Sequence, residues 1–119
     1  MPDSQKTSKS HLRKALGWSL AGLVAAWQEI AFRQEIYSFC VLIPLAFVLG
    51  QSGVERAMLI GSLLLILIVE VLNTAVEAAI DRISLEHHSL SGKAKDLASA
   101  AVFIAMINAA VVWLLIVLD

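Results

Sequence analysis

Three long apolar runs divide the chain. Leu97–Leu118 contains 22 residues without a charge, and Ala57–Ile80 contains 24 residues interrupted only by a few polar positions. At 1.5 Å per residue the 22-residue run would be about 33 Å long, enough to cross a hydrocarbon core of about 30 Å. Ile36–Gly50 has only 15 residues and contains Pro44, so it becomes a convincing span only if the preceding AFRQE joins the same helix. The pattern predicts transmembrane helices over about 32–50, 57–81 and 92–118.

Residues 11–28, HLRKALGWSLAGLVAAWQ, show a different pattern. Leucines at positions 12, 16, 20 and 23 and Trp27 follow helical spacing and form one apolar stripe. Small residues lie beside the stripe and the cations cluster at its start, which is typical of an amphipathic helix on the membrane surface. A secretory signal peptide, with a charged start and a 13-residue apolar core, is the alternative.

Composition supports a membrane protein. Hydrophobic residues make up 59% of the chain and charged residues 16%, against about 45–50% and about 25% in soluble domains. With no internal repeat or linker, we expect one domain over 1–119: an all-α integral membrane protein with an N-terminal amphipathic surface helix, three transmembrane helices and a loop at 82–91. The net charge of −1 argues against a nucleic-acid partner, and the single Cys40 provides neither a disulfide framework nor a cysteine metal cluster.

The basic residues predict the orientation of these helices, because short loops rich in lysine and arginine stay in the cytoplasm. Arg56 is the one basic residue between the first two spans, and nothing basic follows the third. We therefore expect a cytoplasmic N-terminus and 81–96 segment, and a C-terminus outside. The other basic residues lie before the first span or between the second and third: Lys6, Lys9, Arg13, Lys14, Arg33, Arg82, Lys93 and Lys95.

The second apolar run ends in a polar stripe, VEVLNTAVEAAIDR. At 100° per residue, four other polar side chains lie within about 60° of Glu70 on a helix. A carboxylate at membrane depth is energetically costly and is usually functional. Because the outer half of the run offers only Ser62, the stripe favours chemistry at the cytoplasmic interface over transport. For Asn73 and Thr74, a purely structural role is equally open, in which they form hydrogen bonds with other polar groups between packed helices. The stripe consists of Glu70, Asn73, Thr74, Glu77 and Asp81.

The segment DRISLEHHSLSGKAKDLASAA supplies further polar groups. Ser91 is the expected N-cap of the third span, and Gly92, Lys95, Asp96 and Ser99 then share one helical face. A helix start with a lysine can bind phosphate, although lysines at a membrane boundary are often only topology anchors. No Walker A or glycine-rich kinase loop is present. The required groups for phosphoryl transfer are nevertheless available: carboxylates for a base and for magnesium, and cations for phosphate oxygens.

Three motifs, AFRQE, VEVLNTAVEAAIDR and SGKAKDLASAAV, resemble the prokaryotic diacylglycerol kinase family. The resemblance extends from about His11 to Trp113. It implies a homotrimer in the bacterial inner membrane, each subunit having a surface helix and three transmembrane helices, with active sites at subunit boundaries. It also implies the reaction: transfer of the γ-phosphoryl group of MgATP to the hydroxyl of diacylglycerol, which makes phosphatidate. The C-terminus would then be periplasmic.

Residue roles follow from the same resemblance. Glu70 would be the general base, and Glu29 and Glu77 would hold Mg²⁺ with its ATP. In the N-terminal helix this chain departs from the family pattern, with His11 and Trp18 where relatives carry an arginine and a tyrosine. The implied ATP-binding residues are Trp18, Glu29, Glu77, Glu86, His87, His88, Lys95 and Asp96. The implied lipid-substrate residues are Glu70, Asn73, Ser99 and Arg33.

Other functions remain open on the sequence. Undecaprenol kinase, the activity of Gram-positive relatives, is the nearest alternative, although AFRQE and AIDRI look more like the Gram-negative branch. A small oligomeric proton or ion channel would need polar groups in the outer half of a span, where Ser62 and Asn108 are the candidates. A non-catalytic membrane adaptor would tolerate replacement of its carboxylates.

Overall fold

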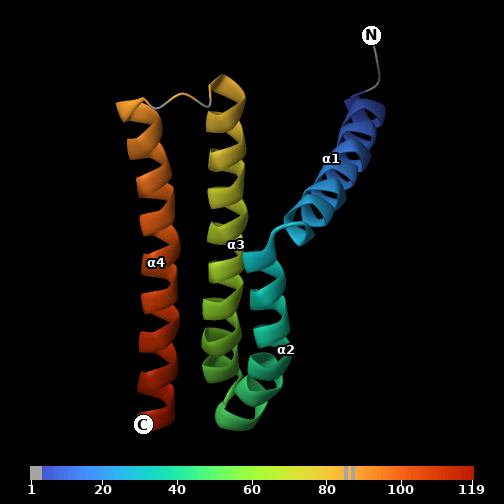
Figure 1. The fold of residues 1–119 in the computed structure, drawn as a ribbon. Coiled ribbons are helices and arrows are strands. Elements are labelled where there is room, and N and C mark those ends of the chain that lie inside the picture. Colours follow the sequence, from blue (N-terminus) through green and yellow to red (C-terminus); the bar gives the residue numbers. More distant parts are fainter. Residues whose placement is uncertain (1–3, 85, 87) are drawn as a thin grey trace.

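The computed structural model describes residues 4–84, 86 and 88–119 and is all-helical over them. Its four helices are α1 (Ser4–Trp27), α2 (Ile30–Leu49), α3 (Gly53–Ile83) and α4 (Ser89–Leu118). Helices α3 and α4 run antiparallel side by side, α2 lies along one half of α3, and α1 leaves the start of α2 at an angle (Figure 1). The predicted all-α fold is confirmed, and α2, α3 and α4 are each long and apolar enough to cross a membrane.

The helix ends explain where the spans start and stop. Helix α2 begins at Ile30, so AFRQE belongs to it, and it continues through Pro44 to Leu49. Helix α3 begins earlier than the expected position 57 because the Ser52 hydroxyl accepts a hydrogen bond from the backbone N–H of Glu55 at 3.1 Å. Helix α1 begins at Ser4 rather than at position 11.

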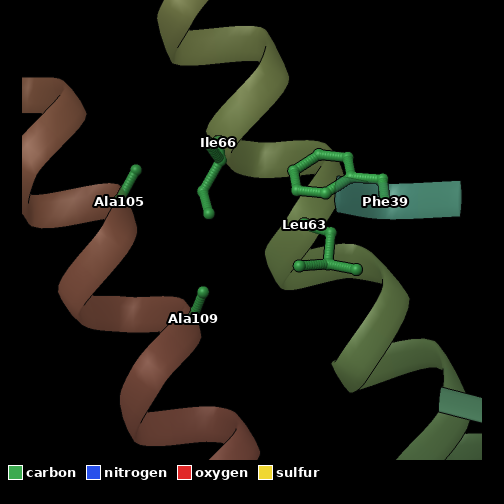
Figure 2. Close-up of a cluster of buried hydrophobic side chains, with 5 residues drawn as sticks. All are labelled: Phe39, Leu63, Ile66, Ala105 and Ala109. Atoms are coloured by element: carbon green, nitrogen blue, oxygen red, sulfur yellow. The ribbon is translucent and has the colours of Figure 1, made fainter. Parts of the chain in front are cut away.

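A compact cluster of buried side chains holds the three long helices together. Phe39 of α2 and Leu63 and Ile66 of α3 face Ala105 and Ala109 of α4 (Figure 2). The two alanines are one helical turn apart, and their small side chains let α4 approach α3 closely, as is common in membrane helix pairs. This packing determines which faces of α2 and α3 meet, and it therefore positions the polar groups in the C-terminal half of α3.

The N-terminal half of α3 contributes a polar contact to the same interface. Ser62 is 5% exposed, and its hydroxyl donates to the Leu59 carbonyl oxygen at 2.8 Å. The indole Nε1–H of Trp113 lies 3.2 Å from the Ser62 hydroxyl and 3.3 Å from the same carbonyl. Ser62, the polar residue within the apolar run AMLIGSLLLILI, therefore links α3 to α4.

Candidate active site

The polar stripe of α3 is present as predicted on one side of the helix. Glu70, Asn73 and Thr74 are half-buried, whereas Glu77 is exposed. Asn73 Nδ2 donates to Glu77 Oε1 at 3.4 Å, and the Thr74 hydroxyl donates to the Glu70 carbonyl oxygen at 3.1 Å. The Asn73 side-chain oxygen is buried without a hydrogen-bond partner. Asn73 thus orients Glu77 and retains an unused acceptor, which a substrate donor could occupy.

Helix α2 brings two further carboxylates to this stripe. Glu35 and Glu70 lie close enough to interact, and Glu70 is also within electrostatic range of Glu29 and Glu77. Glu29 is the residue that precedes α2, and its carbonyl oxygen accepts from the backbone N–H of half-buried Arg33 at 3.2 Å. Glu70 is therefore the carboxylate that interacts with the other three, with Glu35 directly and with Glu29 and Glu77 at longer range.

Sequence reasoning missed Glu35 as a member of this group. It placed the residue only at the membrane interface, because nothing in the linear pattern connects α2 to a particular turn of α3. One signal was available in the sequence: Glu35 lies six residues after Glu29, less than two helical turns further along the chain. In the structure Glu35 Oε2 is buried without a hydrogen-bond partner.

A groove lies beside Glu35 among the three long helices. Its volume is about 360 Å³. Its lining includes both hydrogen-bonding and apolar side chains, as a ligand with a polar head and an acyl chain would require. The hydrogen-bonding residues are Gln34, Glu35 and Ser38, and the apolar residues are Ala31, Phe39, Ile66 and Met106.

The carboxylates fit a magnesium ion that arrives with a nucleotide better than a resident one. Among the described residues, no three histidine, cysteine, aspartate or glutamate side chains converge as a preformed metal site. Mg²⁺ is commonly bound by one or two carboxylates together with substrate phosphates. Glu29 and Glu77, both exposed and both within electrostatic range of Glu70, are the carboxylates that could bind such an ion.

A second cavity lies where the C-terminal end of α3 meets the N-terminal end of α4 and has a volume of about 180 Å³. Lys95 Nζ donates to Asp81 Oδ1 across it at 2.8 Å. Lys95 is also within electrostatic range of Glu77. The cavity therefore offers an ammonium group beside the carboxylate stripe. Its lining residues are Ile80, Asp81, Ser84, Glu86, His88, Ser91, Gly92 and Lys95.

The start of α4 corrects one prediction. The N-cap is His88 and not Ser91, because His88 has an extended backbone and its Nδ1 accepts from the backbone N–H of Leu90 at 3.0 Å. Ser91 lies within the first turn and lines the cavity. Glu86 also lines it, and its backbone N–H donates to the Ser84 hydroxyl at 3.0 Å. His87 lies outside the described residues.

Three predicted site residues lie apart from this cavity. Asp96 lines a separate groove with Lys93 on another side of Gly92. Ser99 is exposed on α4. Trp18 is 64% exposed on α1 and packs edge-to-face against His11, with 6.4 Å between ring centroids. All three side chains are therefore open to contact with another molecule.

Comparison with known proteins identifies the family to which this chain belongs. Residues 17–117 match the family described as prokaryotic diacylglycerol kinase. A protein of Pseudomonas aeruginosa named diacylglycerol kinase is 49% identical over 118 residues, which cover 98% of this chain and 96% of the relative. Proteins of the same name from Haemophilus influenzae and Escherichia coli are each 47% identical over 108 residues, covering 90% of this chain and 92% and 88% of the respective relatives.

Proposed function

Because the chain belongs to the prokaryotic diacylglycerol kinase family, we propose that it transfers the γ-phosphoryl group of ATP to the hydroxyl of diacylglycerol, which yields phosphatidate. The observation that carries the proposal is that Glu70 of α3 lies against Glu35 of α2 and within electrostatic range of Glu29 and Glu77. Undecaprenol is not favoured as the acceptor, since the similar proteins are named for diacylglycerol.

Glu70 is the proposed general base. It is the deepest carboxylate of the stripe, about 10 Å along the helix axis from Glu77. The groove that Glu35 shares with Phe39 begins at the same level and suits a lipid whose hydroxyl meets carboxylates while its acyl chain contacts apolar side chains. In this arrangement Glu70 removes the hydroxyl proton as the oxygen attacks the γ-phosphorus. Asn73, Arg33 and Ser99 are the proposed further contacts to the lipid.

Glu29 and Glu77 would hold magnesium together with the nucleotide phosphates. When bound, Mg²⁺ supplies positive charge to the phosphate oxygens at which negative charge accumulates. The hydrogen bond from Asn73 restrains Glu77 for this task. Lys95, across the adjoining cavity, provides a cation for the same phosphate groups. Trp18, Glu86, His87, His88 and Asp96 are the remaining proposed contacts to ATP.

The proposed setting is the inner membrane of a bacterium. The N-terminus and the α3–α4 connection would face the cytoplasm, because they carry most of the basic residues. We place the active sites at the boundaries of a homotrimer. Trp18, Asp96 and Ser99 are exposed in a single subunit, which is compatible with a site that two subunits complete.

Phosphate transfer from labelled ATP in mixed micelles tests the proposal, with diacylglycerol and undecaprenol offered in parallel. Glu70→Gln should lower kcat by about 10²- to 10⁴-fold, the usual contribution of a general base, while binding of a non-hydrolysable MgATP analogue stays close to wild type. Glu77→Gln should instead weaken binding of the analogue. Glu55→Gln, a matched change at the opposite end of α3, should change neither quantity.

Two results would contradict the proposal. Labelled undecaprenyl phosphate in place of phosphatidate would assign the other acceptor. Equal losses of analogue binding in Glu70→Gln and Glu77→Gln would remove the separate roles of base and metal ligand. Cross-linking of purified protein should reach trimers, and products that stopped at dimers would reject the proposed assembly.

A further inference from the structure

The ion pair between Asp81 and Lys95 connects two helices at the edge of the candidate nucleotide cavity. Lys95 Nζ lies 2.8 Å from Asp81 Oδ1, and the side chains are 42% and 47% exposed. The two residues are 14 positions apart, on opposite sides of the α3–α4 connection. An ion pair this exposed contributes little to stability. The function of this ion pair is therefore better sought in where it holds the Lys95 side chain than in the stability of the fold.

Asp81 restrains a side chain that would otherwise be mobile. A lysine ammonium is a point charge on a flexible stem with three N–H donors. One donor is directed to Asp81, and the ammonium is also within electrostatic range of Glu77, one helical turn before Asp81 on α3. The other two donors remain for further acceptors. Lys95 is thereby held over the end of α3 that carries Glu77, on the side of α4 that lines the cavity.

We infer that Asp81 is a positioning residue that orients Lys95 to receive the phosphate groups of the bound nucleotide. This inference rests on the proposed kinase function, which assigned Lys95 to the nucleotide and left Asp81 without a role. Asp81 and Lys95 compensate each other's charge, so the pair presents an oriented donor without adding net charge to the cavity.

A simple charge effect and a positioning effect predict opposite changes in nucleotide binding when Asp81 is replaced, so an experiment can distinguish them. Removing the Asp81 carboxylate makes the cavity more positive, so simple electrostatics expects Asp81→Asn to bind a polyphosphate more tightly. Loss of positioning expects weaker binding. The sign of the change therefore separates the two effects.

The experiment measures the Kd of a non-hydrolysable MgATP analogue for the full-length protein in micelles, together with kcat and KM for ATP. Asp81→Asn should raise Kd and KM about two- to fivefold, the range expected for an exposed charge pair, with kcat at saturating ATP close to wild type. Asp81→Glu, which keeps the charge on a longer stem, should recover part of the loss. Asp119→Asn, the same substitution at the far end of α4, is the matched control.

A double-mutant cycle separates positioning from a general structural effect. In a Lys95→Met background, Asp81→Asn should cause no further loss of analogue binding, because its effect operates through Lys95. Equal losses in both backgrounds, or unchanged or tighter binding in Asp81→Asn, would overturn the inference. Should Asp81→Asn fail to fold, the same cycle with Asp81→Ser, which also removes the carboxylate, decides in the same way. Absence of phosphate transfer by the wild-type protein would instead reject the kinase proposal itself.

Discussion

Replacement of His88 tests what the start of α4 does for nucleotide binding. The ring Nδ1 of His88 accepts from the backbone N–H of Leu90 at 3.0 Å, and its carbonyl oxygen accepts from the backbone N–H of Gly92 at 2.9 Å. The turn that these bonds order carries Ser91 and Gly92 into the cavity and leads directly to Lys95. His88→Ala removes the side-chain acceptor while leaving the backbone bond available.

The size of the effect follows from helix capping. Loss of an N-cap acceptor costs about 1 kcal/mol, which corresponds to about a fivefold smaller equilibrium constant between the ordered and the frayed turn. If nucleotide binding requires that turn, His88→Ala should raise the Kd of a non-hydrolysable MgATP analogue by up to about fivefold. Amide hydrogen exchange in the first turn of α4 should accelerate by a similar factor.

Asparagine at position 88 provides the decisive comparison. Its side-chain oxygen is a favoured N-cap acceptor, but it lacks the imidazole ring. His88→Asn should therefore restore the exchange rates and the part of the Kd that depends on the cap, and any loss of binding that remains measures the proposed contact of the ring with ATP. Ser52→Ala, which removes the corresponding cap of α3 at the opposite end, should leave the Kd unchanged. If His88→Asn bound the analogue as poorly as His88→Ala while its exchange rates were normal, capping would be refuted and the ring itself would be the nucleotide contact.

Two further predictions concern the joints that position the helices. A Cβ on Gly50 would lie 2.5 Å from Arg56 Cγ and 3.0 Å from the Ala46 carbonyl oxygen, so Gly50→Ala should lower stability in detergent by about 1–3 kcal/mol, measured by thermal unfolding. Gly53→Ala, with nothing within 4 Å of the new Cβ, is its control, and equal melting temperatures for the two variants would contradict the steric argument. Trp113→Phe should cost about 0.6 kcal/mol, the average for a hydrogen bond between membrane helices, and the loss should shrink in a Ser62→Ala background. An undiminished loss there would mean that the indole stabilises the interface through packing alone.

Much of the fold could be predicted from the sequence because the relevant signals are local. The length of an apolar run decides whether a helix can cross a bilayer, and helical periodicity decides which side chains share a face. The spans and the polar stripe from Glu70 to Glu77 follow from these two rules. The absence of a Walker A motif could also be read directly from the order of the residues.

The candidate site depended on contacts between residues far apart in the chain. Glu35 meets Glu70 only because Phe39 and Leu63 pack α2 against a particular side of α3. The Asp81–Lys95 pair likewise depends on how α4 returns beside α3 after its short connection. Neither the rotation nor the axial shift of one helix against its neighbour is encoded in the periodicity of either helix.

The cap of α4 shows the same division on a smaller scale. Serine is a preferred N-cap, so the sequence pointed to Ser91, whereas the helix begins three residues earlier with His88 as its cap. The preference describes which side chains can cap, but it does not say at which of several suitable residues the backbone leaves its extended conformation. By itself, then, the sequence determined the membrane helices and the chemistry they carry. Only tertiary packing decided which charged groups meet, because the interhelical contacts depend on the side chains of two helices at once.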